Sequence, residues 1–218
     1  MSYQLGIHWL MEADEFTFKI GIENMPISHR LALSVTVSFY DPVGIGAPVT
    51  LPVKMWLQDM RQQGLAWDDK LHDGEMLTWK RWLEELPELS QFRLARSFIP
   101  MSFNPVQWYQ LHHFADASWK GYGTATYLRT IGESGEVFCI LVTGCARVAS
   151  LKKTTVPRLE LTAVAVAACM DAKLRLELDL KLLPSIFWTD STSVLKYLFN
   201  ETACYQPLWQ TECISFVT

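Results

Sequence analysis

The order of apolar segments between residues 106 and 199 constrains the fold of this chain more than any other feature. Three strand-like runs separated by short turns come first, at 108–115, 121–129 and 137–148. Residues 133–135 (ESG) supply the hairpin turn between the last two runs. Because consecutive strands joined by short turns pair antiparallel, these runs predict a three-strand meander.

A helical crossover follows the predicted meander. Pro157 opens a long helical pattern that runs to about residue 178, which suits proline in a first helical turn. A fourth strand is expected at 185–189, after Pro184, and a further helix from 190 to about 199. The order strand, strand, strand, helix, strand, helix is typical of an α/β fold in which the fourth strand is added to the meander by the helical crossover.

The first hundred residues carry structure but no recognisable chemistry. Residues 3–22 alternate and predict two strands joined by the acidic turn 12–15, and we expect them to have partners upstream because an isolated hairpin is barely stable. Residues 28–40 indicate a short helix or an extended segment, which the DPVG sequence at 41–44 breaks. The apolar spacing then predicts helices at 52–63 and 74–86.

Composition excludes several classes of protein. Hydrophobic residues make up 50% of the 218, so the chain has enough apolar surface for a packed core and is not disordered. The net charge of -4 argues against a general nucleic-acid binder. The 5 cysteines form no Cys-x-x-Cys pair, which argues against zinc and disulfide frameworks and for reduced thiols. No apolar run is long enough to cross a membrane.

Three carboxylates lie at positions where this fold would bring them together. Asp116 closes the first strand of the meander, Glu160 lies in the first turn of the long helix, and Asp190 closes the fourth strand. Carboxylates that converge need a hard cation, and two Mg²⁺ or Mn²⁺ ions about 4 Å apart are suited to phosphodiester hydrolysis. Each acid also has a structural interpretation: Asp190 as a helix N-cap, Glu160 as a favourable charge near a helix N-terminus, and Asp116 as a turn residue.

The other candidate residues are basic or histidine. A basic stretch surrounds the start of the long helix and contains Arg147, Lys152, Lys153 and Arg158. It is either a solvated loop or an edge that contacts phosphates beside an active site. On a strand, His112 and His113 point to opposite faces, and we interpret both as structural. No Asp-Thr-Gly or Asp-Ser-Gly sequence occurs, so an aspartic peptidase site is absent.

Several motifs in one order resemble the Pol polyprotein of Bel/Pao-type LTR retrotransposons, over roughly residues 3–203. In the second half these are HHFADAS (112–118), GYG (121–123), RV to KK (147–153), TVPRLEL (155–161), FWTDS (187–191) and KYLFNET (196–202). In the first half, LGIHW (5–9) resembles the strand just after the polymerase active site, and SFYDPVG (38–44) and WDD (67–69) resemble the region that joins the polymerase to the nuclease.

The resemblance implies a ribonuclease H-like fold in which Asp116, Glu160 and Asp190 hold the catalytic metal ions. It divides the chain into an end-of-reverse-transcriptase remnant (end of the palm, thumb and connection, 1–104), an incomplete ribonuclease H-like domain (105–205) and a divergent tail (206–218). The implied reaction is hydrolysis of the RNA strand of an RNA–DNA hybrid. The implied partners are a polymerase core upstream and an integrase downstream, and the implied place is a cytoplasmic particle, without membrane contact.

Two departures from the family limit these expectations. The polymerase signature Tyr-x-Asp-Asp is absent, which argues against DNA synthesis by this chain. Residues 207–218 do not resemble the family's continuation, and Glu212, their one acid, is not assigned the role of the fourth metal ligand. We therefore expect the domain to be truncated at its C-terminal end, with an exposed sheet edge. The alternative function is a catalytically inactive retroelement fragment that acts as a scaffold or has no function.

Overall fold

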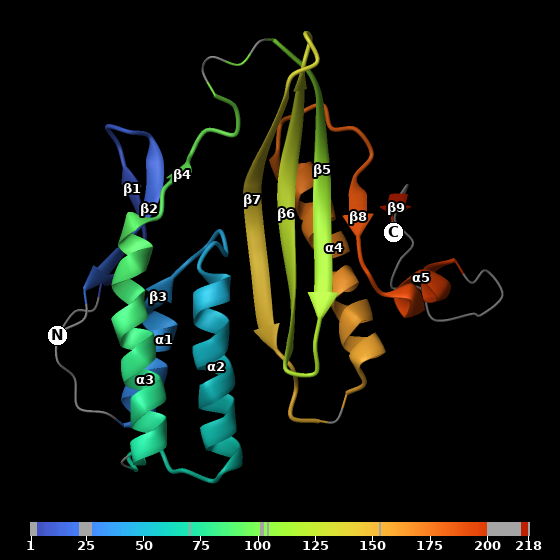
Figure 1. Cartoon of the computed structure of the whole chain (residues 1–218). Coiled ribbons are helices and arrows are strands. Elements are labelled where there is room, and N and C mark those ends of the chain that lie inside the picture. The colour runs from blue at the N-terminus through green and yellow to red at the C-terminus, as the bar shows by residue number, and fades with distance from the viewer. Residues whose placement is uncertain are drawn as a thin grey trace. The chain divides into compact units, whose positions relative to one another are not determined.

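Two sheets, one in each half of the chain, organise the protein (Figure 1). The computed structural model describes residues 4–21, 28–69, 71–100, 103, 105–152, 154–199 and 215–217. The chain divides into a first unit, Met1–Ser97, and a second unit, Phe98–Thr218. The mixed α/β class expected from the sequence is confirmed.

The first unit combines a small mixed sheet with helices. In the described residues its strands lie in the order β3-β1-β2-β4, with β1 antiparallel to β2 and parallel to β3. Its strands are β1 (Gln4–Leu10), β2 (Glu15–Gly21), β3 (Phe39–Tyr40) and β4 (Leu94–Ala95). Its helices are α1 (His29–Ser38), α2 (Ala47–Gln62), α3 (Asp73–Glu85) and the short 3-10 helix η1 (Leu86–Gln91).

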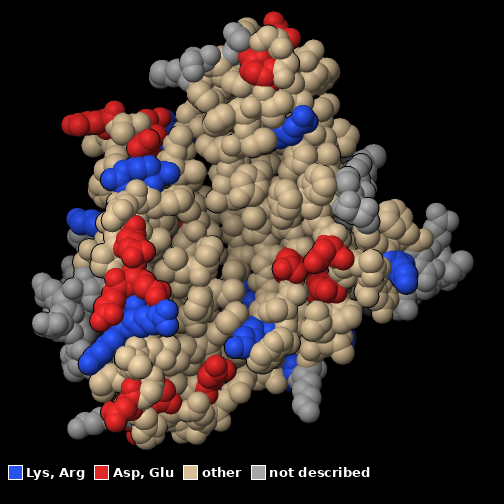
Figure 2. All heavy atoms as spheres, in the orientation of Figure 1, with Lys and Arg blue, Asp and Glu red and all other residues tan. Residues whose placement is uncertain are grey.

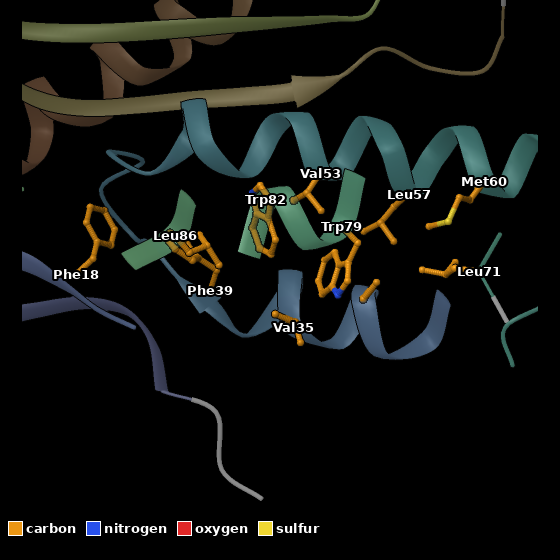
Figure 3. Close-up of a cluster of buried hydrophobic side chains, with 11 residues drawn as sticks. Phe18, Val35, Phe39, Val53, Leu57, Met60, Leu71, Trp79, Trp82 and Leu86 are labelled. Carbon is orange, nitrogen blue, oxygen red and sulfur yellow. The ribbon is translucent and has the colours of Figure 1, made fainter. Parts of the chain in front are cut away.

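Aromatic and aliphatic side chains from all three α-helices form the core of the first unit (Figure 3). Trp79 stacks on Trp82 at a ring-centroid distance of 5.1 Å and on Trp56 at 5.6 Å. The indole nitrogen of Trp82 donates to the carbonyl oxygen of Val49 at 2.9 Å, so this large ring is buried with its polar group satisfied. Trp56, Trp79 and Trp82 therefore join α2 to α3.

Helix α2 begins five residues earlier than the sequence predicts. Its first residue is Ala47, not Pro52, and Pro52 lies inside the helix, where it removes one intrahelical hydrogen bond. The Asp41 carboxylate explains the early start, because it accepts the backbone N–H groups of Gly44 (2.9 Å), Ile45 (3.1 Å) and Gly46 (2.7 Å). The helix therefore begins directly after a loop that Asp41 has already ordered.

The second unit follows the predicted order of elements closely. Its strands are β5 (Val106–Ala117), β6 (Gly121–Gly132), β7 (Val137–Val148), β8 (Ile186–Trp188) and β9 (Ser215–Val217). Its helices are α4 (Val156–Glu177) and α5 (Thr192–Leu198). Strands β5, β6 and β7 form the antiparallel meander, and β8 joins β5 in parallel after the α4 crossover. Gly135, with φ of 87°, provides the left-handed turn residue between β6 and β7.

Helix α4 packs against β5 and β6, on one face of this sheet. Leu111 of β5 and Leu128 of β6 are fully buried on that face. A cluster of small and aromatic residues continues it toward β8 and α5: Ala115, Ala163, Val164, Ala167, Phe187 and Val194. The alanines let α4 approach the sheet closely, which brings its first turn near the ends of β5 and β8.

The sequence predicts an exposed sheet edge at β8, but the described residues include one further strand at that position. Strand β9 pairs in parallel with β8, so that Ile186, Phe187 and Trp188 lie opposite Ser215, Phe216 and Val217. The short strand β8 therefore has a neighbour on both sides. The remainder of the divergent tail, and the end of the motif at 196–202, lie outside the described residues. None of the described helices has the length and apolarity needed to cross a membrane.

Candidate functional site

The parallel pairing of β5 with β8 joins the two segments that lead to Asp116 and Asp190, two of the three predicted acids. His112, His113 and Phe114 lie opposite Ile186, Phe187 and Trp188. The last paired residues, Phe114 and Trp188, precede Asp116 and Asp190 by two positions each. Adjacent strands lie about 4.8 Å apart, so the segments that carry the two acids start from neighbouring backbones. Both side chains are exposed.

The third acid, Glu160, is bound to the residue that follows Asp190. The hydroxyl of Ser191 donates to Oε2 of Glu160 at 2.6 Å, and its oxygen accepts the backbone N–H of Val194 at 3.2 Å. Ser191 is thus the N-cap of α5 and also a direct link to the first turn of α4. This link brings Glu160 to the segment that carries Asp190.

The donor set at this edge fits a hard divalent cation, because all three groups are carboxylates. Figure 2 shows acidic side chains gathered near the end of β5 and the start of α5. Among the described residues, however, no group of three His, Cys, Asp or Glu side chains is already in position to hold a metal ion. Asp116 instead accepts its neighbour's N–H, from Ala117, at 2.7 Å. Metal binding by all three acids therefore requires their side chains to turn toward one another.

The predicted basic stretch lies beside this edge. Arg147 is near the end of β7, Lys152 is in the loop that follows, and Arg158 is in the first turn of α4; all three are exposed. A hydrogen bond with the Tyr122 side chain, assisted by nearby Cys145, raises the pKa of Arg147 above its usual value. Lys153 lies outside the described residues.

The two histidines of β5 point to opposite faces, as the sequence predicts. His112 is half-buried; its Nδ1 accepts the indole N–H of Trp188 at 3.1 Å. Burial, then the charges of Arg129 and His113, lower the pKa of His112 below its usual value. Because the indole can only donate, His112 is neutral with its proton on Nε2, close to Gln110. This contact joins β8 to β5 on the face that α4 does not cover.

His113 belongs to a buried polar network that sequence reasoning missed. Its Nδ1 lies 2.8 Å from the Thr126 hydroxyl and its Nε2 lies 3.0 Å from Oδ1 of Asp171 in α4. Ser185 donates to the same Asp171 oxygen, and Arg175 binds the Asp171 carboxylate at 3.1 Å. We name these five residues the His113 network. It joins α4 to β5, to β6 and to the residue before β8.

Within the His113 network, the negative charge of Asp171 is paired with the positive charge of Arg175. Burial alone would raise the pKa of Asp171, but the hydrogen bonds from His113 and Ser185 and the charge of Arg175 outweigh burial and lower it. Arg175 also donates to the carbonyl of Leu183 at 2.8 Å and to Ser185 at 2.6 Å. One sequence signal was available: Asp171 and Arg175 are an acid–base pair at i,i+4 spacing on the long predicted helix.

Comparison with known proteins identifies the family. No curated protein matches the chain at a significant level. A family model described as "Pao retrotransposon-like RNaseH-like domain" matches residues 28–191, well over half of the chain. The match begins in the first unit and ends at Ser191, so it includes Asp116, Glu160 and Asp190. The resemblance to Bel/Pao-type retrotransposons is confirmed, and the chain belongs to the family of Pao retrotransposon-like RNaseH-like domains.

Proposed function

We propose that the second unit is a ribonuclease H-like nuclease domain that hydrolyses the RNA strand of an RNA–DNA hybrid with Mg²⁺ or Mn²⁺. The observation that carries the proposal is that Ser191, the residue after Asp190, binds Glu160, while the pairing of β5 with β8 ends two residues before Asp116 and Asp190. The three carboxylates are far apart in sequence, but the segments that carry them are paired or hydrogen-bonded to one another.

The three acids by themselves disfavour the proposed substrate. A phosphodiester is an anion, so exposed carboxylates at this edge repel it until cations neutralise them. Two divalent ions, held by Asp116, Glu160 and Asp190, would supply that neutralisation, activate water and stabilise the leaving oxygen. The protein's own part is to hold the carboxylates at one edge and to offer Arg147, Lys152, Lys153 and Arg158 to the phosphates. Activity should therefore depend fully on divalent metal.

The first unit would connect this nuclease to a reverse transcriptase. Its motifs resemble the region between polymerase and nuclease, and it contains a small sheet and a tryptophan-rich helical core of its own. The partners would be the polymerase and integrase portions of a retroelement polyprotein, together with the hybrid. Its role would be one of binding and positioning.

A second candidate function is that of a catalytically inactive retroelement domain. The observation that favours it is that, in the described residues, the acids do not already form a metal-binding group. The two candidates make different predictions for metal. An active nuclease binds Mn²⁺ through Asp116, whereas an inactive scaffold binds it weakly, and equally with and without that carboxylate.

The test is cleavage of a labelled RNA–DNA hybrid by the whole chain, in Mg²⁺, in Mn²⁺ and in EDTA. We expect cleavage of the RNA strand to products with a 3′-hydroxyl, no cleavage in EDTA, and no cleavage of single-stranded RNA. Asp116→Asn is the matched control, because Asp116 is exposed and the amide has nearly the same shape. Metal-dependent cleavage that is equal in wild type and Asp116→Asn would indicate a contaminant and refute the proposal. No cleavage together with no Asp116-dependent Mn²⁺ binding would favour the inactive domain.

A further inference from the structure

The connection between β5 and β6 presents a tryptophan to solvent beside the acidic edge. Trp119 is 72% exposed, the highest exposure of any tryptophan in the described residues. It follows Asp116 by three positions, and the ammonium of Lys120 lies 4.9 Å from the centre of its ring. A large apolar ring at this position contributes little to the core, since most of its surface remains in water.

The turn that carries Trp119 is held firmly. The N–H of Ser118 donates to the carbonyl of Gly121 at 2.7 Å, and the N–H of Lys120 donates to the Ser118 hydroxyl at 3.3 Å. The turn is also joined to the loop after β7, because the N–H of Ala149 donates to the carbonyl of Lys120 at 2.8 Å. The ring is therefore attached to a backbone that loses little further freedom when a ligand binds.

The same hydrogen bond brings two separate basic segments together. Lys120 lies on the β5–β6 turn, whereas Arg147 and Lys152 flank Ala149 in sequence, and all three are exposed. Figure 2 shows basic side chains near this turn, close to the acidic group at the end of β5. An exposed indole with one cation over its ring, and two more cations on a segment hydrogen-bonded to the same turn, suits a nucleic-acid strand: the ring packs on a base or sugar and the cations pair with phosphates.

We propose that Trp119, Lys120, Arg147 and Lys152 form a strand-binding rim that holds the nucleic acid beside the acidic edge. Trp119 packs against a sugar or base of one strand, and the three basic residues contact its phosphates. The rim rests on the proposed function for the identity of the ligand, an RNA–DNA hybrid. The rim supplies its own positive charges, so it binds the strand without divalent metal although the nearby carboxylates oppose binding, and binding is measurable separately from hydrolysis.

The test measures binding of a fluorescein-labelled RNA–DNA hybrid by anisotropy, in EDTA, for wild type and variants. We expect Trp119→Ala to weaken binding by about fivefold or more, as expected for loss of one aromatic packing contact. Trp119→Phe should restore most of the affinity. Lys120→Ala should reduce the slope of log K against log salt by about 1, the value for one lost phosphate contact.

Trp108→Ala is the matched control, because Trp108 lies at the opposite end of β5 in the same unit and is 39% exposed. Its hybrid affinity should equal that of wild type. The rim is refuted if wild type does not bind the hybrid, if Trp119→Ala binds as wild type does, or if Trp108→Ala loses as much. Cleavage assays separate the two proposals. If the chain binds the hybrid without metal through Trp119 but does not cleave it when metal is added, the rim is supported and the nuclease is contradicted. Cleavage whose KM is unchanged by Trp119→Ala contradicts the rim alone.

Discussion

Replacing Asp171 by asparagine should destabilise the second unit far more than the loss of an ordinary helical ion pair does. The carboxylate accepts hydrogen bonds from His113, Ser185 and Arg175 at once. Asparagine has a similar shape, but it has one oxygen in place of two, and its NH₂ group can only donate. That NH₂ group would face groups that also donate, so at least one buried donor loses its acceptor.

The expected penalty is about 3 kcal/mol. Breaking a buried charge pair by removing one partner costs about 3–5 kcal/mol, and each buried donor left without an acceptor costs about 1–3 kcal/mol. We take the lower end because the Arg175 side chain is 34% exposed, so water can solvate part of it once the partner is gone. The His113 side chain is fully buried and has no such access to water.

The chain offers a matched control in the first unit. Arg81 and Glu85 are also an Arg–carboxylate pair at i,i+4, with a distance of 3.2 Å, but their side chains are 80% and 59% exposed. Glu85→Gln should cost no more than about 0.5 kcal/mol. The free energy of unfolding is measured by urea denaturation, and hydrogen exchange of the α3 and α4 peptides assigns each loss to its unit. An Asp171→Asn penalty below about 0.5 kcal/mol, or one equal to that of Glu85→Gln, would refute the reasoning.

Three further predictions follow from other contacts. The pKa of Asp171 is lowered in the folded protein, so its carboxylate contributes stability that is complete above the usual carboxyl range and is lost as the pH falls through the lowered pKa. The loss of unfolding free energy caused by Asp171→Asn, measured in urea, should therefore shrink below about pH 4. A constant penalty down to pH 2 would contradict this. Asp41→Ala should destabilise the first unit by about 2 kcal/mol, since three backbone N–H groups lose their acceptor, and exchange should rise first at the start of α2. Unchanged exchange there would be evidence against it. Ser191→Ala should lower the free energy of unfolding more than Ser28→Ala does. Both serines cap a helix, which contributes about 1 kcal/mol, but Ser191 also binds Glu160. Equal losses in thermal unfolding would show that the Glu160 bond contributes nothing.

The second unit was largely predictable because its elements are long and their boundaries carry strong local signals. Pro157 lies in the first turn of α4, Pro184 precedes β8, and Gly135 turns the chain between β6 and β7. The first unit was harder. The predicted start of α2 was wrong because the Asp41 carboxylate binds backbone N–H groups three to five residues ahead of it, and apolar periodicity carries no sign of such a contact.

The candidate site was predictable only in part. The positions of Asp116, Glu160 and Asp190 at element ends follow from the pattern, but the Ser191–Glu160 bond depends on how α4 packs on the sheet. The His113 network joins residues that are 58 and 14 positions apart, from His113 to Asp171 and from Asp171 to Ser185. No local pattern carries such distant pairs. Strand β9 was missed because residues 206–218 resemble no continuation of the family.

The attachments of the short strand β8 bear on whether a genomic copy of a retroelement is intact. Strand β8 pairs with β5 through only three residues, and it is fixed from both sides of the sheet, by Ser185 in the His113 network and by the Trp188–His112 contact. If either attachment is lost, the segment that carries Asp190 can shift although Asp190 itself is unchanged. Under the proposed nuclease function, a genomic copy would therefore become inactive through a substitution at Asp171 or Trp188 while it keeps all three acids. A survey that counts only the acids would overestimate the number of functional copies.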